Sequence, residues 1–142
     1  VPEGIDEARE HLVETVQAAM ELSGVDESRL LLGGFSQGAM LTVDTALRGL
    51  ERPPAAACLY SGCLICEREW KPLAGRLQGS TILQSHGRLD PILPFQTGLW
   101  LRDMLVEAGC QVEFLEFDGM HTIPLPAIDR TAGILTDLTN AP

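Results

Sequence analysis

The sequence predicts an α/β fold in which helices cover both faces of a parallel sheet. Short apolar runs of six or seven residues alternate with longer segments of helical pattern, and glycine or proline separates one segment from the next. Apolar runs of that length are typical of buried strands. Regular alternation of strands with helices predicts parallel strands joined by helical crossovers.

The first half of the chain predicts a helix, a strand and a second helix. Residues 5–22 have apolar side chains at steps of three and four, and Ser23-Gly24 follows as a stop signal. Residues 29–35 contain three consecutive leucines and two glycines, and this run is too short for a helix, so we expect a buried strand. The pattern becomes helical again over 36–50, and Pro53-Pro54 breaks it.

The second half of the chain predicts three more strands and two more helices. The expected strands are residues 55–60, 80–85 and 111–117. An irregular stretch is expected over 61–78. A helix is expected over 95–108, where Gly109 stops it, and another from Pro126 onward, near a helix start where proline is tolerated. No repeat or linker interrupts residues 1–142, so we expect a single domain.

Composition and charge exclude several classes of protein. The chain is 45% hydrophobic and 21% charged, which is typical of a folded domain rather than a disordered one. Ten basic residues against 20 acidic ones give a net charge of −10, which disfavours nucleic acid and anionic membrane surfaces as partners. No apolar run approaches the roughly 18 residues of a membrane span. The polar, acidic first residues do not resemble a signal peptide.

The cysteines give a weak signal for metal or redox chemistry. Cys63 and Cys66 form a C-x-x-C pair, but no second pair or histidine at ligand spacing accompanies it. Cys58 lies in an apolar run and is expected to pack as a small hydrophobic residue. We therefore expect packing cysteines, with a disulfide or a metal site as the alternative. We expect no metal or cofactor, and a reducing, cytoplasmic compartment.

A candidate nucleophile lies in Gly34-Phe35-Ser36-Gln37-Gly38, which matches the pattern G-x-S-x-G. The pattern falls where an apolar strand ends and a helix begins, the setting of a serine on a sharp, strained turn. Side chains in place of the two glycines would clash in such a turn. The backbone N–H of Gln37, at the helix start, would point toward an oxyanion. The alternative is a glycine-rich turn whose serine caps the helix.

A serine hydroxyl needs a base that takes its proton, and the chain has three histidines. His11 lies among glutamates in the first expected helix, a pattern typical of a solvent-exposed face. His86 ends the third expected strand. His121 follows the fourth strand, and loops after parallel strands meet at the same edge of the sheet as Ser36. We expect His121 to be the base, with a loop histidine that caps a helix as the alternative.

Two aspartates compete for the role of orienting acid. Asp90 follows the third strand and precedes Pro91, which stiffens its turn, whereas Asp118 follows the fourth strand and suits an ordinary turn. We expect Asp90, because it stands on a neighbouring strand's loop and gives the chain order Ser, Asp, His that accompanies this fold. A buried acid there would fix the histidine tautomer. His86 is then expected to be structural, with hydrogen bonds inside the Asp90 loop.

Four segments carry a more specific pattern than G-x-S-x-G alone. They are residues 33–40 (GGFSQGAM), 59–62 (LYSG), 86–94 (HGRLDPILP) and 119–121 (GMH). Through them the chain resembles the phospholipase/carboxylesterase family of α/β-hydrolases, which includes the acyl-protein thioesterases. The resemblance implies a serine hydrolase that acts on a small-molecule ester or thioester without a cofactor. It also implies that Ser36, Asp90 and His121 form the catalytic triad and that the Gln37 amide binds the oxyanion.

The family pattern also contains parts that this sequence does not match. Family members begin with several strands and an H-G-x-G-D loop that supplies a second oxyanion amide, so we expect about the first third of the domain to be missing. Residues 62–66 also replace a longer family segment that contains a proline. The strand at 29–35 would then form an open, apolar edge, and one missing oxyanion donor costs about 2.7–4 kcal/mol of barrier. The alternative function is a truncated, weakly catalytic chain that self-associates, as a homodimer, or binds a partner through this edge.

Overall fold

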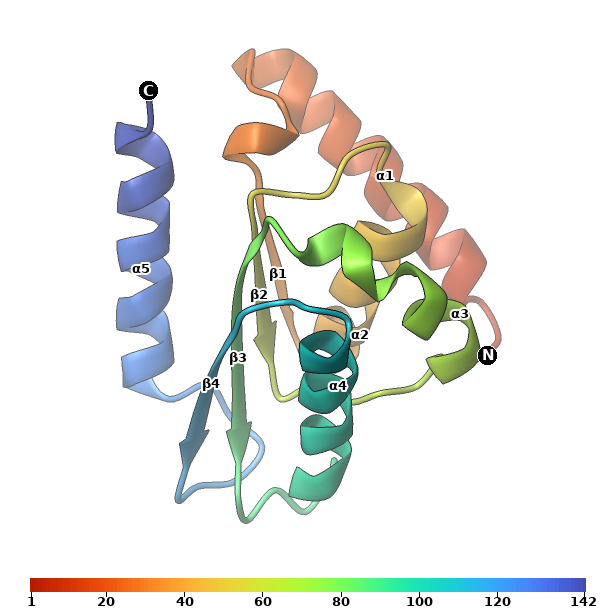
Figure 1. Ribbon diagram of the computed structural model, residues 1–142, viewed down its shortest axis with the longest axis vertical. Coiled ribbons are helices and arrows are strands. Elements are labelled where there is room, and N and C mark those ends of the chain that lie inside the picture. The colour runs from red at the N-terminus through yellow and green to blue at the C-terminus, as the bar shows by residue number, and fades with distance from the viewer.

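The computed structural model describes residues 1–142 and contains a four-stranded parallel sheet with helices on both faces (Figure 1). The strands are β1 (Leu31–Phe35), β2 (Ala56–Tyr60), β3 (Thr81–Gly87) and β4 (Val112–Phe117). The helices are α1 (Ile5–Ser23), α2 (Gln37–Asp44), α3 (Glu67–Trp70), α4 (Phe95–Glu107) and α5 (Leu125–Asn140). The strands lie in chain order, and each neighbouring pair is parallel. The predicted fold class and its four strands are confirmed.

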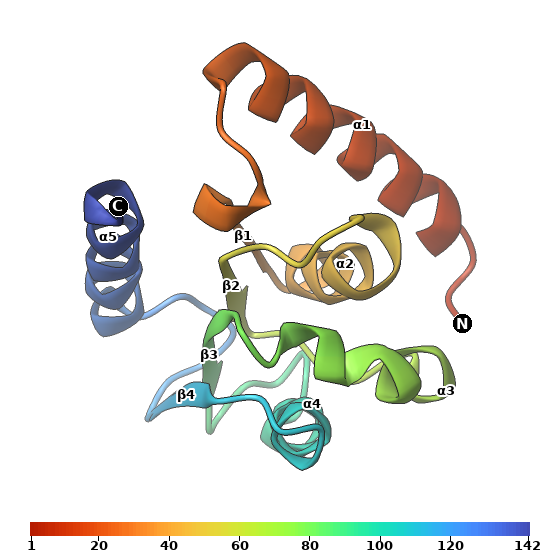
Figure 2. The same cartoon turned by 45° about the horizontal axis from the view of Figure 1, so that its top comes forward.

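The two faces of the sheet carry unequal layers of helices. Figures 1 and 2 show α5 alone on one face and the other four helices on the opposite face. Successive side chains of a strand point to opposite faces. Leu59 and Ile82 therefore join the larger core with α2, α3 and α4, whereas Cys58 and Leu83 pack against Ile134 of α5. Burial on both faces explains why these strands read as continuous apolar runs.

The stretch 61–78, predicted to be irregular, is in part helical, so that prediction is wrong. α3 runs directly into a 3-10 helix, Lys71–Leu77, that has a proline at its start. Trp70, Ala74 and Leu77 are buried in the larger core, and their spacing of four and three residues is that of a helix face. The proline masks this pattern in the sequence, although a helix tolerates proline in its first turn.

Two other boundaries differ from the predicted ones. The helix predicted over 36–50 is α2 followed by a π-helical turn, Thr45–Gly49. A short 3-10 turn, Glu27–Arg29, precedes β1 and delays the start of the strand to Leu31. These differences leave the order of elements unchanged.

β1 forms one edge of the sheet, as predicted, because it pairs with β2 alone. Its apolar surface is not fully open, since Leu32 is buried against Val16 of α1. Leu30 and Leu31 are half-buried. The backbone groups of this edge are therefore free to pair, while α1 covers part of the side-chain surface.

Asp44 is a fully buried carboxylate that ties three helices together. Its Oδ2 accepts a hydrogen bond from Arg9 of α1 at 2.8 Å. Its Oδ1 accepts from the indole N–H of Trp70 at 2.8 Å and from Arg48 at 3.1 Å. A carboxylate without water needs opposite charge and several hydrogen bonds, and Asp44 has both. This cluster fixes α1 and α3 against the end of α2.

We expect Asp44→Asn to lower the free energy of unfolding by about 2–3 kcal/mol. The amide leaves the two arginines with only the exposed Asp6 as a counter-charge, and their partial exposure keeps the loss below that of a fully buried pair. Urea unfolding measures the change. Asp103→Asn is the matched control, because Asp103 pairs with Arg102 at the surface, where such pairs contribute little. Equal unfolding midpoints for Asp44→Asn and the wild type would contradict the structural role of Asp44.

Candidate active site

Ser36 lies on a strained turn between β1 and α2. Its backbone has φ 58° and ψ −119°, and it is one of two non-glycine residues with positive φ. Its N–H donates to the carbonyl of Tyr60 at 2.8 Å, which extends the pairing of β1 with β2 by one residue. The Ser36 side chain makes no capping hydrogen bond to α2. The side chain of this serine therefore does not cap the helix.

The two glycines of the turn have different roles. A Cβ atom on Gly34 would lie 2.3 Å from the carbonyl group of Gly38, so no side chain fits at position 34. A Cβ atom on Gly38 would have no neighbour within 4 Å. The prediction that side chains at both positions would clash is confirmed for Gly34 and wrong for Gly38, because the peptide group of Gly38, rather than its Cα hydrogens, faces Gly34.

The three side chains predicted to act together form one chain of hydrogen bonds. His121 Nε2 lies 2.9 Å from Ser36 Oγ, and His121 Nδ1 lies 2.7 Å from Asp90 Oδ2. Ser36, Asp90 and His121 follow β1, β3 and β4, so the parallel sheet brings the three side chains to the carboxyl ends of its strands. An Nδ1–H that donates to the carboxylate leaves Nε2 free to accept the serine proton.

The Asp90 carboxylate is enclosed by donors. Its side chain is fully buried, and Oδ1 accepts the backbone N–H groups of Ile92 and Leu93, each at 2.8 Å. Burial raises the pKa of Asp90, but the hydrogen bonds from His121, Leu93 and Ile92 together lower it more, so its pKa lies below the usual 3.8. This environment favours the charged form of the carboxylate.

The remaining histidines and the second aspartate are not members of this chain of hydrogen bonds, although His86 Nε2 lies 3.5 Å from Asp90 Oδ2. His86 is buried, and its Nε2 lies 2.8 Å from the carbonyl of Leu93, which confirms the predicted hydrogen bond inside the Asp90 loop. Asp118 is 81% exposed and pairs with Arg88 at the surface. His11 is exposed on α1. The structure therefore brings Asp90, and not Asp118, to His121.

Sequence analysis missed a contact on the ring of the histidine. The Phe35 and His121 rings lie 4.7 Å apart between centroids with an interplanar angle of 45°. Phe35 is the residue before Ser36, and it remains 38% exposed at the end of β1. An aromatic residue directly before the serine of the G-x-S-x-G pattern is the sequence signal that could have pointed to it. Phe35 restricts the tilt of the imidazole while Asp90 restricts its rotation.

The Gln37 amide lies at the start of α2 with no acceptor in the preceding turn of the helix. The amides of Ala39 and Met40, further along, already donate to the Ser36 carbonyl at 3.0 and 3.3 Å. A free N–H next to Ser36, at the positive end of a helix, suits the binding of an anionic oxygen.

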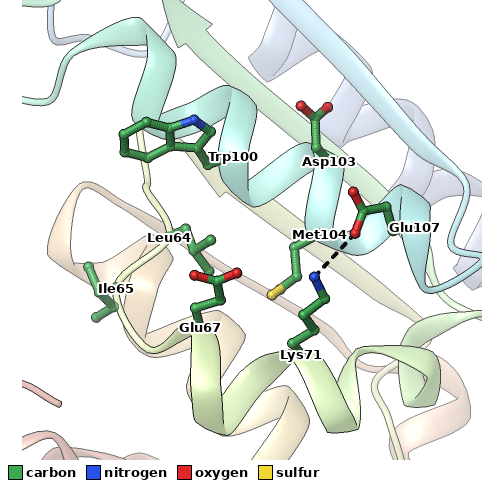
Figure 3. A pocket seen from close by; sticks show the side chains of 8 residues that line it. All are labelled: Leu64, Ile65, Glu67, Lys71, Trp100, Asp103, Met104 and Glu107. Atoms are coloured by element: carbon green, nitrogen blue, oxygen red, sulfur yellow. Dashed lines mark ion pairs between the residues drawn. The ribbon is translucent and has the colours of Figure 1, made fainter.

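A cavity of about 460 Å³ opens beside Ser36. Its walls come from the start of α1, with Ile5 and Ala8, and from α2, with Met40 and Leu41. A second cavity of about 560 Å³ lies between α3 and α4, with Trp100 at one end and an ion pair between Lys71 and Glu107 at the other (Figure 3). None of Ser36, Asp90 and His121 lines the second cavity.

The cysteines and the acidic residues form no metal site. All four cysteines are buried and free, as predicted for packing residues, and burial raises the pKa of each thiol. No group of three or more His, Cys, Asp or Glu side chains is placed to hold a metal ion.

None of the helices combines the length and hydropathy needed to cross a bilayer.

Comparison with known proteins finds relatives by sequence and solved structures with the same fold. Acyl-protein thioesterase 1 of Neurospora crassa is 30% identical over 118 residues, which cover 81% of this chain and 48% of that protein. Acyl-protein thioesterase 1 homolog 1 of Dictyostelium discoideum is 28% identical over 131 residues, or 87% of this chain and 55% of that protein. The crystal structure of Zea mays acyl-protein thioesterase 2 shares the fold, with a TM-score of 0.77 at 24% identity over 96% of this chain and 65% of that one.

The chain thus spans about half the length of the curated relatives it matches. The family described as Phospholipase/Carboxylesterase matches residues 2–130, which include the strained serine turn and the loops of Asp90 and His121. The match covers nearly all of the chain and agrees with the fold. This chain belongs to the phospholipase/carboxylesterase family.

Proposed function

We propose that this chain is a serine hydrolase that cleaves carboxylic esters or thioesters through an acyl-enzyme on Ser36. The observation that carries the proposal is the chain of hydrogen bonds of 2.9 and 2.7 Å from Ser36 through His121 to Asp90. The chain of hydrogen bonds ends at a half-buried serine held in a strained turn, the geometry of an activated nucleophile.

In the first step, His121 Nε2 takes the proton of Ser36 Oγ, and the oxygen attacks the acyl carbon. The bond from the acyl carbon to the leaving oxygen or sulfur then breaks, and the leaving group takes the proton from His121. Water, deprotonated by His121, attacks the acyl-enzyme, the bond from the acyl carbon to Ser36 Oγ breaks, and His121 returns the proton to Ser36 Oγ as the acid leaves. Asp90 remains anionic throughout and stabilises the imidazolium that forms in both steps.

The negative charge that develops on the acyl oxygen requires a donor. The Gln37 amide supplies one at the start of α2, where the helix dipole also favours negative charge. The family resemblance implies a second amide from an H-G-x-G-D loop, a motif that residues 1–142 do not contain. With a single donor, transition-state stabilisation is reduced by about 2.7–4 kcal/mol.

The cavity beside Ser36 suits the acyl portion of the substrate. Ile5, Ala8, Met40 and Leu41 give it apolar walls, and burial of apolar surface favours an alkyl chain there. Two curated relatives matched by sequence are acyl-protein thioesterases, which supports an acyl ester or thioester as the substrate class. The four free cysteines suit a reducing, cytoplasmic compartment.

The free edge of β1 favours a second candidate function, self-association or binding of a partner strand. An apolar edge strand with unpaired backbone groups can add a strand from another chain. A homodimer of this kind does not require a reactive serine. Covalent reaction of Ser36 with a fluorophosphonate is therefore expected from the hydrolase and is not expected from a purely structural chain.

We expect Ser36→Ala and His121→Ala each to lower kcat for p-nitrophenyl butyrate by a factor on the order of 10⁴ or more, because neither variant can activate the nucleophile. Steady-state hydrolysis of the ester measures this. His11→Ala removes an exposed histidine from α1 and is the matched control, which should retain kcat. Undiminished turnover by Ser36→Ala would exclude the proposed nucleophile.

We expect Ala8→Phe to fill the cavity beside Ser36 and to select against long acyl chains. kcat/KM for an octanoyl ester should fall about tenfold relative to an acetyl ester, the scale of steric discrimination in apolar pockets. Ala18→Phe, on an exposed part of α1, is the matched control and should leave the ratio unchanged. An unchanged ratio in Ala8→Phe would mean that the acyl chain lies elsewhere.

The lowered pKa of Asp90 predicts a pH-dependent contribution to stability. Because the folded pKa lies below the unfolded value of about 3.9, the charged carboxylate stabilises the fold above that pH, and the contribution is lost as pH falls through the folded pKa. We expect the wild type to have a higher free energy of unfolding than Asp90→Asn. The difference should be largest at about pH 7 and should shrink below about pH 4. Urea unfolding across this range measures it.

A stability difference that stays constant with pH would contradict the lowered pKa. The same variant separates the two candidate acids. Asp90→Asn should lower kcat by about 10⁴-fold, whereas Asp118→Asn, a change at an exposed side chain that pairs with Arg88, should retain activity.

A further inference from the structure

One segment that the family resemblance singled out, residues 59–62, has no part in the proposed mechanism. Within it, Ser61 shares an unusual backbone conformation with the nucleophile. Ser36, with φ 58°, and Ser61, with φ 51°, are the two non-glycine residues of the chain at positive φ. Such strain persists only where surrounding structure enforces it, and it gathers at functional sites.

The register of the sheet places the two serines next to each other. Phe35 of β1 pairs with Tyr60 of β2, so Ser36 and Ser61 are the first residues beyond the ends of adjacent strands. The Ser61 N–H donates to the carbonyl of Ser85 at 2.8 Å and extends the pairing of β2 with β3. Ser61 is fully buried, and a buried hydroxyl requires a partner inside the protein.

That partner lies in the loop that carries the base. Ser61 Oγ donates to the carbonyl of Thr122, the residue after His121, at 3.2 Å. On the other side of His121, the Leu89 N–H donates to the carbonyl of Gly119 at 3.0 Å. The backbone around the imidazole is thus held at both ends, and Ser61 provides the contact on the C-terminal side.

We propose that Ser61 is a positioning residue for His121. Its hydroxyl holds the Thr122 carbonyl and thereby keeps His121 Nε2 at 2.9 Å from Ser36 Oγ. Asp90 orients the ring through Nδ1 but does not hold the backbone of the loop. A glycine would adopt φ 51° without steric cost, so the turn alone does not require serine; what the serine adds is the hydroxyl. This inference rests on the proposed function, in which His121 takes the serine proton.

Two substitutions separate the hydroxyl from the backbone strain. Ser61→Ala removes the hydroxyl and keeps the strain, whereas Ser61→Gly removes both. Ser80→Ala is the matched control, because Ser80 is also buried and its hydroxyl also donates to a carbonyl, that of Pro54 at 2.7 Å. Ser80 directly precedes β3, so it lies at the amino-terminal ends of the strands, whereas the site lies at their carboxyl ends.

The experiment uses two measurements on each folded variant. The rate of covalent labelling of Ser36 by a fluorophosphonate reports the assembled site. The proton NMR signal of His121 Nδ1–H reports its hydrogen bond to Asp90 without any need for activity. We expect both Ser61 variants to label about 10- to 100-fold more slowly, the effect of a small misplacement of a catalytic group, with a broadened or lost Nδ1–H signal. Ser80→Ala should match the wild type in both measurements.

Thermal melting confirms that each variant folds, and Ser61→Gly should be at least as stable as Ser61→Ala because it relieves strain. Wild-type labelling and an unchanged signal in both Ser61 variants would overturn the proposal. Slow labelling in Ser61→Ala alone would overturn it too, since backbone strain and not the hydroxyl would then matter. If the wild type itself does not label at Ser36, the proposed function fails. The Nδ1–H signal then decides the role of Ser61: its loss in both variants supports positioning, and its retention refutes it.

Discussion

The turn at Ser36 is the constraint on which the rest of the site depends. A serine at φ 58° stays in place because Gly34 lets β1 pass against the carbonyl group of Gly38 at a distance that no side chain permits. The direction of the chain through this turn sets where α2 begins, and hence where the Gln37 amide lies. His121 reaches the serine only because its loop, like the turn at Ser36, follows the carboxyl end of a strand in the parallel sheet.

Two buried aspartates meet the cost of desolvation in different ways. Asp44 is surrounded by two guanidinium groups and an indole N–H, so its charge is matched permanently and it serves the architecture. It clamps α1 through Arg9, the neighbour of Ala8, which lines the cavity at the serine. Asp90 has no permanent cation and relies on amides and on the imidazole. This environment suits the proposed role of Asp90, the stabilisation of a charge that would appear on His121 only during the proposed reaction.

The sequence was sufficient for the four strands, for four of the five α-helices and for the meeting of Ser36, Asp90 and His121, because hydrophobic period and strand-end placement are local properties of the chain. It was insufficient where tertiary packing decides. Residues 61–78 form helical turns because the core buries one face of them, despite the proline near their middle. The roles of Gly38 and Ser61 depend on which atoms of distant segments face them, and no local pattern encodes that.

The place of β1 at the edge of the sheet links the two candidate functions. β1 carries the strained serine but has ladder hydrogen bonds to one neighbour alone. The turn is restrained instead by packing: Gly34 against α2, Leu32 against α1 and the Phe35 ring against His121. A strand added at the free edge would give β1 a second set of backbone hydrogen bonds and would favour the strained geometry at Ser36. Pairing at this edge and catalysis at its end are therefore compatible, since the first supports the conformation that the second requires.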